Sequence, residues 1–196
     1  MTTVHTGIPD EQFVRGDIPM TKREIRMFAL AQAAIAETDV VWDIGAGTGS
    51  LSVESALLTK RGKVFAIEKE IEGCGLISQN AEKFCCTNIK VICGSAPEVL
   101  RDLPDPDLIW VGGSGGNLQG ILAAGAEKMK PGGRMVILSI LVETLQETLR
   151  FISEQPFATY EACGLQVTRI EPVGRRHMMH ALNPVFIIVC RKGAQI

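Results

Sequence analysis

The stretch VVWDIGAGTGS, residues 40–50, decides the fold of this chain. A short apolar run ends in Asp43, and glycines then occupy every second position, at Gly45, Gly47 and Gly49. The apolar run predicts a buried strand, and the segment SLSVESALLTK that follows predicts a helix. Glycine leaves room for a ligand beside the backbone, and the amides that open the helix point to the same place. The stretch therefore predicts a strand–turn–helix unit with a ligand site beyond the end of the strand.

Strand-like and helix-like segments alternate along most of the chain. Because apolar strands alternate with helices, the pattern predicts an α/β fold in which helices cover both faces of a parallel sheet. Residues 1–20 show no periodicity and predict an irregular arm, and TKRE at 21–24 matches a capping box at the start of the first helix. The predicted strands are 40–45, 63–68, 88–94, 106–113 and 133–141, and the predicted helices begin near 21, 50, 71, 97, 117 and 142.

The end of the chain breaks this alternation. The segments LQVTRIEPV (165–173) and NPVFIIVCRK (183–192) are both strand-like, and GRRHMMHAL between them is too short for a helical crossover. We therefore expect an antiparallel pair that closes the otherwise parallel sheet. No internal repeat or linker is evident, so residues 1–196 are predicted to form a single domain.

Composition narrows the class of protein. Of the 196 residues, 46% are hydrophobic and 21% charged, and the formal net charge of −2 gives no basic field for a nucleic acid. No apolar run reaches membrane-spanning length and the N-terminus lacks the core of a signal peptide, so we expect a cytoplasmic protein that needs no membrane. The six cysteines form no C-x-x-C pair, which predicts reduced, mostly buried thiols and no metal site.

An acidic residue at the end of the second predicted strand points to a nucleoside ligand. Glu68 lies 19 residues after Gly49, close to the spacing at which a carboxylate binds ribose hydroxyls in a βαβ unit. A dinucleotide fingerprint would need a third glycine where Ser50 stands. The nucleotide is therefore not expected to be a dinucleotide.

The motif DIGAGTG resembles the first motif of class I S-adenosylmethionine-dependent methyltransferases, and the likeness spans residues 21–192. It implies their Rossmann-like fold, with a seven-stranded sheet that ends in an antiparallel hairpin. It also implies that Asp43 orients the loop and the amino group of S-adenosylmethionine, that Glu68 holds the ribose, and that GSAPE (94–98) binds adenine, although the family often has Asp at Ser95. The implied cofactor site comprises Thr21, Asp43, Gly45, Ala46, Gly47, Thr48, Gly49, Glu68, Ser95 and Ala96.

Three further segments resemble the decarboxylating precorrin methyltransferases of cobalamin biosynthesis, the CbiT type. They are residues 7–26, residues 107–122 and LNPVFII at 182–188. The resemblance implies methylation of carbon-15 of a precorrin with loss of carbon dioxide from an acetate side chain. It aligns Thr21 with a threonine that contacts the cofactor. It also suggests a homotetramer and a separate enzyme for carbon-5.

Two segments are candidates for binding the tetrapyrrole. VGGSGG (111–116) offers a flat floor, which makes Gly113, Ser114 and Gly115 substrate-binding candidates. Arg175 and Arg176 in GRRHMMH can pair with substrate carboxylates, and a solvated basic loop is the alternative for that segment. No catalytic acid or base is assigned.

Other functions stay open at this stage. The chain could be another class I methyltransferase that acts on tRNA or protein, an NAD-binding oxidoreductase, or a nucleotide-binding subunit without catalytic activity. The net charge weighs against tRNA, and Ser50 and the terminal hairpin weigh against NAD. The absence of an evident catalytic base keeps the third alternative open.

Overall fold

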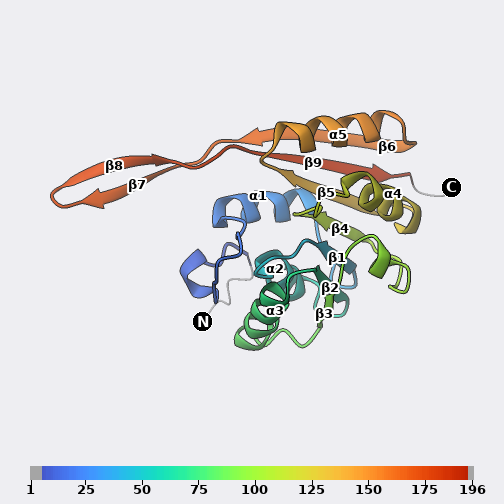
Figure 1. Cartoon of the computed structure of the whole chain (residues 1–196), viewed down its shortest axis with the longest axis horizontal. Coiled ribbons are helices and arrows are strands. Elements are labelled where there is room, and N and C mark those ends of the chain that lie inside the picture. The colour runs from blue at the N-terminus through green and yellow to red at the C-terminus, as the bar shows by residue number, and fades with distance from the viewer. Residues whose placement is uncertain (1–5, 194–196) are drawn as a thin grey trace.

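The computed structural model describes residues 6–193, and its centre is a seven-stranded sheet (Figure 1). The strand order is β3-β2-β1-β4-β5-β9-β6. The first five strands along the chain are parallel, and β9 runs antiparallel between β5 and β6. The predicted fold class, a mostly parallel sheet with an antiparallel end, is confirmed. The strands are β1 (Val40–Ile44), β2 (Lys63–Glu68), β3 (Ile89–Cys93), β4 (Leu108–Val111), β5 (Arg134–Ser139), β6 (Phe157–Leu165) and β9 (Val185–Lys192).

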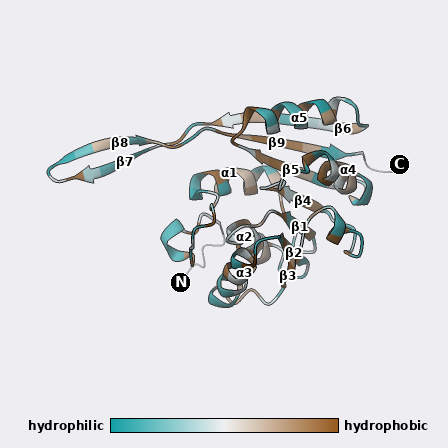
Figure 2. Ribbon diagram, in the orientation of Figure 1, coloured by the Kyte–Doolittle hydropathy of each residue, from teal (hydrophilic) through white to brown (hydrophobic). Residues whose placement is uncertain are grey.

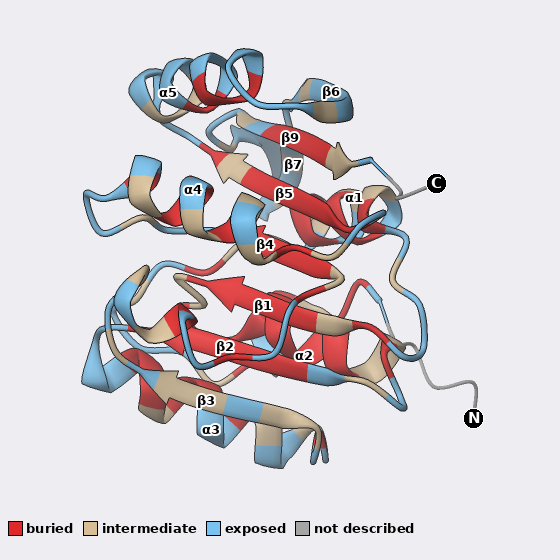
Figure 3. Ribbon diagram, turned by 90° about the vertical axis from the view of Figure 1, so that its right-hand side faces the viewer, coloured by how far each residue is buried: buried red, intermediate tan, exposed pale blue. Residues whose placement is uncertain are grey.

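Helices cover both faces of this sheet, as the alternating pattern predicts. The helices that follow the arm and the first two strands lie on one face, and those that follow β4 and β5 lie on the other (Figure 3). Two short 3-10 helices, η1 in the N-terminal arm and η2 after β3, complete the described elements before the last strands. The bounds are η1 (Asp10–Gln12), α1 (Arg23–Ala33), α2 (Ser50–Leu58) and α3 (Ile71–Lys83) on the first side, and η2 (Glu98–Leu100), α4 (Leu118–Lys128) and α5 (Val142–Ser153) on the second.

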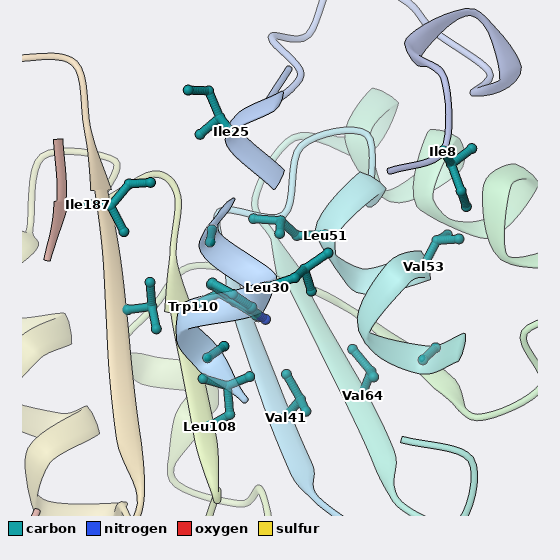
Figure 4. Close-up of a cluster of buried hydrophobic side chains, with 14 of the residues drawn as sticks. Ile8, Ile25, Leu30, Val41, Leu51, Val53, Val64, Leu108, Trp110 and Ile187 are labelled. Carbon is teal, nitrogen blue, oxygen red and sulfur yellow. The ribbon is translucent and has the colours of Figure 1, made fainter. Parts of the chain in front are cut away.

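The core consists of two apolar layers, one on each face of the sheet. Successive residues of a strand point to opposite faces, so Trp110 packs with α1 and α2 while Trp42 packs on the α4 and α5 side (Figure 4). Both indoles are fully buried, and each Nε1 donates a hydrogen bond, to Ser55 Oγ at 3.0 Å and to the carbonyl of Pro104 at 3.1 Å. The central strands are accordingly the most hydrophobic part of the ribbon (Figure 2).

The last strands differ from the prediction. The two neighbours of β9 are β5 and β6, and residues 165–173 are not one strand. Instead β7 (Thr168–Val173) and β8 (Arg176–Ala181) form a separate two-stranded sheet that projects far from the main sheet (Figure 1). Most residues of β6 are exposed, so its sequence carries little of the apolar signal of a buried strand. Gly174, with φ of +61°, opens the two-residue turn from β7 to β8, as a type II′ hairpin requires.

The predicted start of the first helix is also wrong. The capping box at 21–24 does not form, because α1 begins at Arg23 and its cap residue, Lys22, makes no side-chain bond to the helix. The carboxylate of Glu24 instead accepts hydrogen bonds from Arg169 at 3.0 and 2.7 Å. A long-range ion pair has replaced the local cap.

The expectation that all cysteines are reduced and mostly buried is wrong as well. Cys74 and Cys93 form a disulfide, because the first turn of α3 lies against the end of β3 with the two Cα atoms 6.0 Å apart. Among the other cysteines, Cys86 and Cys190 are buried while Cys85 is exposed. Burial raises the pKa of the Cys86 thiol to about 11 and that of Cys190 to about 12, so both stay protonated at neutral pH.

The N-terminal arm packs on α1 and α2 through a buried arginine. The side chain of Arg26 is fully buried and donates to Glu54 and to Asp10, both at 2.8 Å. The Arg26 guanidinium also lies over the ring of Phe13 in the arm, 4.8 Å from its centroid. Asp10 accepts a second bond, at 3.1 Å, from Arg169 of β7. The network thus holds the arm, two helices and the base of the projecting hairpin together beside the carboxyl edge of the sheet.

None of the helices in the described part of the chain has the length and apolar character needed to cross a bilayer.

Candidate active site

The glycine loop after β1 lies at the carboxyl edge of the sheet. Gly45 and Gly47 have φ of +70° and +58°, backbone angles that residues other than glycine rarely adopt. A Cβ atom on Gly45 would lie 2.5 Å from the backbone of Gly113, and one on Gly47 would lie 3.0 Å from the carbonyl of Pro19. The loop therefore needs glycine at Gly45 to lie close to the backbone after β4, and at Gly47 to lie close to the N-terminal arm.

Gly49 serves another purpose. It caps α2 with φ of +76°, and a Cβ there would lie 3.1 Å from Ile77 of α3. This glycine allows α2 and α3 to pack closely and lines neither of the two cavities described below.

Glu68 links the end of β2 to the glycine loop. Its carboxylate is buried and accepts hydrogen bonds from the backbone amide of Gly47 at 2.9 Å, of Lys69 at 2.8 Å and of Glu70 at 3.0 Å. Three amide donors hold the side chain in one orientation at the wall of a cavity. The residue that the spacing identified is therefore positioned as a fixed acceptor.

Cavity A, of about 500 Å³, extends from the glycine loop across the ends of β2, β3 and β4. It contains Glu68 and the turn after β3, and it also contains the glycine-rich segment after β4. Gly113, Ser114 and Gly115 were predicted for the substrate, but they lie with Glu68 in this cavity. The predicted site residues that line cavity A are Gly45, Gly47, Glu68, Ser95, Ala96, Gly113, Ser114 and Gly115.

Cavity B, of about 550 Å³, lies between the glycine loop, the start of α1 and the base of the projecting hairpin. Its inner end is formed by buried residues such as Asp43 and Ser50, and its mouth by exposed ones such as Arg15, Ile140 and His180. The predicted site residues that line cavity B are Thr21, Asp43, Gly45 and Ala46.

The two cavities meet at a narrow wall. Pro19, Gly45 and Gly112 line both of them. Proline and two glycines leave little side-chain volume at this point, so a ligand in cavity A can reach a second ligand in cavity B there.

Asp43 is an unusual acid at the inner end of cavity B. Burial raises its pKa to about 6, the hydrogen bond that Ser52 Oγ donates at 2.5 Å opposes the shift, and the nearby charge of Glu68 adds to it. Asp43 therefore changes protonation near pH 6, at the inner end of cavity B.

Some predicted site residues lie elsewhere. Thr48 is buried and lines neither cavity. Arg175 and Arg176 lie at the far turn of the projecting hairpin and line neither cavity, because the segment that contains them folds into β8 and its turn. The cations that do line cavity B are Arg15 and Lys22. Arg15 was not predicted, since an irregular arm carries no periodic signal for it.

The sheet order, the glycine loop beside a fixed carboxylate and the paired cavities define a Rossmann-like methyltransferase. A family model described as a precorrin methyltransferase domain matches residues 11–192. The chain belongs to this family.

Relatives with related names cover almost the whole chain. A protein of Sulfurisphaera tokodaii named probable cobalt-precorrin-6B C(15)-methyltransferase (decarboxylating) is 39% identical over 95% of this chain and 97% of its own length. The cobalt-precorrin-6B C(15)-methyltransferase (decarboxylating) of Salmonella typhimurium is 35% identical over 93% and 95%. The crystal structure of precorrin-6y C5,15-methyltransferase from Geobacter metallireducens superposes with a TM-score of 0.92, at 33% identity, over 97% of this chain and 100% of that one.

Proposed function

We propose that this chain methylates carbon-15 of a precorrin or cobalt-precorrin with S-adenosylmethionine and removes a carboxyl group from the same substrate. The observation that carries the proposal is the pair of cavities that meet at Pro19, Gly45 and Gly112. Two substrates that exchange a group need such a junction, and the family and its named relatives supply their identity.

The residues of cavity A fit the adenosine part of the cofactor. The fixed carboxylate of Glu68 suits two vicinal ribose hydroxyls, and the turn at Ser95 and Ala96 suits the base. The amino-acid end would cross the junction toward Asp43 and Thr21 at the inner end of cavity B. When bound, S-adenosylmethionine supplies a methyl group on a positively charged sulfur.

The outer part of cavity B remains for the acceptor. Arg15 and Lys22 offer cations to substrate carboxylates from one side. Ile140, Leu141 and Val142, at the carboxyl end of β5, form an exposed apolar ledge, and Ile140 also lines the cavity. Such a ledge suits the flat face of a macrocycle too large to enter the cavity whole.

Positioning is the main contribution of the protein to methyl transfer. The glycine loop and Glu68 hold the cofactor on one side of the junction, while the arm and the hairpin base hold the acceptor on the other. Alignment of two reactants in this way lowers a barrier by about 7–11 kcal/mol in favourable cases.

The direct test is mass spectrometry of cobalt-precorrin incubated with the enzyme and S-adenosylmethionine. A product that has gained one methyl group and lost carbon dioxide supports the proposal, and an unchanged substrate contradicts it.

Gly112→Ala tests the junction, since the new Cβ would lie 3.3 Å from the carbonyl of Gly45. We expect kcat to fall at least tenfold with little change in cofactor affinity. Gly75→Ala, in α3 with open space around it, is the matched control.

We also propose a cytoplasmic homotetramer of single-domain chains. The two strands of the projecting hairpin have no partner in the described chain beyond each other, and a lone two-stranded hairpin is marginally stable in water. Its exposed Ile170 and Met179, opposite each other, suit an interface with further copies. The names of the Sulfurisphaera and Salmonella relatives mention only carbon-15, which supports a separate enzyme for carbon-5.

A further inference from the structure

The proposed reaction, on which this inference rests, requires a proton as well as a methyl group. When a carboxylate leaves as carbon dioxide, the pair of electrons of the broken carbon–carbon bond stays on the remaining molecule. The carbon that carried the carboxylate then needs a proton to end as a saturated side chain. A general acid at the acceptor side of the junction can supply that proton.

The side chains that line cavity B leave one suitable donor. Lysine and arginine release a proton only well above neutral pH, and the hydroxyls of threonine and serine higher still. Asp43 lies at the inner end, is fully buried and is already engaged with Ser52 beside the cofactor loop. His180 lies at the mouth, on the acceptor side, and histidine is the side chain that most often acts as a general acid in enzymes.

A carboxylate of the hairpin lies near His180. The imidazole Nδ1 lies 3.6 Å from Glu171 Oε1 on the neighbouring strand β7. Directly opposite His180 in the ladder is Arg169, whose charge is already paired with Glu24 and Asp10. The other charged groups around the cavity are Arg15, Lys22 and Asp43. Glu171 is therefore the carboxylate available to orient the ring, which leaves Nε2 for the substrate.

We propose that His180 is a catalytic residue that donates this proton and that Glu171 is its positioning residue. In the step, the bond between the side-chain carbon and the carboxyl carbon breaks, and carbon dioxide leaves. The electron pair remains on the conjugated macrocycle and forms a new C–H bond with the proton of the imidazolium Nε2. The imidazole is left neutral and takes a new proton from solvent, to which the exposed side chain has access.

The test compares His180→Gln with His177→Gln under single-turnover conditions. His177 is also exposed on β8, but it points to the other face of the hairpin and does not line the cavity. The measurements are the rates of carbon dioxide release and of methyl transfer between pH 5 and 9, and the affinity of each variant for cobalt-precorrin and for S-adenosylmethionine by calorimetry.

For His180→Gln we expect carbon dioxide release to slow about 100-fold, in the range of general acid catalysis, with both affinities within about threefold of wild type. The fall of the wild-type rate toward alkaline pH should disappear in this variant. Glu171→Gln should slow carbon dioxide release less than His180→Gln does, and should shift the pH at which the rate falls on the alkaline side. His177→Gln should behave as wild type.

Three outcomes would overturn the assignment. In the first, His180→Gln keeps the wild-type rate of carbon dioxide release and its fall at alkaline pH. In the second, His180→Gln loses only affinity for cobalt-precorrin. In the third, His177→Gln shows the same defect as His180→Gln. A wild-type enzyme that releases no carbon dioxide and transfers no methyl group would instead refute the proposed function itself. The two failures are therefore distinguishable.

Discussion

Two carboxylates at neighbouring strand ends have different environments. Glu68 accepts three backbone hydrogen bonds, while Asp43 accepts one from a hydroxyl and is buried beside another acid. Hydrogen bonds to a carboxylate favour its charged form, and burial disfavours it. The first residue is thus built as a fixed acceptor and the second as an acid that titrates near neutral pH.

Glu68→Ala tests the fixed acceptor. Removal of the carboxylate deletes the ribose contact and frees the amide of Gly47, so we expect the affinity for S-adenosylmethionine to fall about tenfold or more. Calorimetry measures the change, and circular dichroism checks that the variant is folded. Glu82→Ala, at an exposed position of α3, is the control. An unchanged affinity in folded Glu68→Ala would remove this residue from the site.

Asp43→Asn tests the titrating acid through stability. The folded-state pKa of Asp43 is raised from 3.8 to about 6, so its favourable contribution is complete below about pH 4 and is lost as pH rises through 6. At about 1.4 kcal/mol per pH unit, wild type should lose about 3 kcal/mol relative to Asp43→Asn between pH 4 and 7. Urea unfolding at several pH values measures this, with exposed Asp102→Asn as control. Parallel pH curves for wild type and Asp43→Asn would contradict it.

At the scale of elements, the arm and α1 act as one wall of cavity B because of Arg26. Its guanidinium is fully buried, as is its partner Glu54. Its other partner, Asp10, also forms an ion pair with Arg169 in β7. Arg169 in turn holds the pKa of Asp10 below its usual range together with Arg26, against the opposing effect of burial. The start of α1 and the hairpin base, which both line the cavity, are thereby coupled.

Arg26→Met should destabilise the protein strongly. The substitution leaves Glu54 and Asp10 without their buried partner, and loss of one member of a buried ion pair costs about 3–5 kcal/mol. Arg150→Met removes an exposed pair with Glu154 and should cost under about 1 kcal/mol. Urea unfolding at pH 7 compares them. Equal effects of the two substitutions would show that the network does not support the arm.

At the scale of the whole molecule, the hairpin of β7 and β8 is the part with the least support from the rest of the chain. It projects from the main sheet (Figure 1), and its two strands pair with each other and with no other strand of the described residues. Ile170 and Met179 are 66% and 77% exposed and lie opposite each other on one face. Exposed apolar pairs on an unpaired ribbon are typical of an interface.

Charge on that face should dissociate the assembly. We expect light scattering to give the wild type the mass of four 21.2 kDa chains, and Ile170→Asp with Met179→Asp to give a smaller species. Leu149→Asp, on α5 away from the hairpin, is the control. A monomeric wild type, or a double variant that stays a tetramer, would contradict the proposed interface.

Much of the fold and part of the candidate site could be predicted from the sequence. Strand β1, the glycine loop and Glu68 lie within one βαβ unit, where local spacing determines three-dimensional position. Long-range placement could not be predicted in the same way. Glu24 pairs with Arg169, 145 residues away, and this contact replaces a cap that the local sequence favours.

The sequence by itself determined the alternation of strands and helices, the glycine loop and the carboxylate beside it, because these depend on periodicity and on spacing within short segments. Only the tertiary structure decided that the segment with Arg175 and Arg176 folds into a projecting hairpin, that Gly113 to Gly115 line cavity A, and that His180 lines cavity B. The position of Gly113 to Gly115 depends on the pairing of β4 with β1, which brings the two strand ends together. The positions of the hairpin and of His180 depend on how β9 reverses against β5 and where the chain crosses between β6 and β9, and packing across the whole sheet sets both.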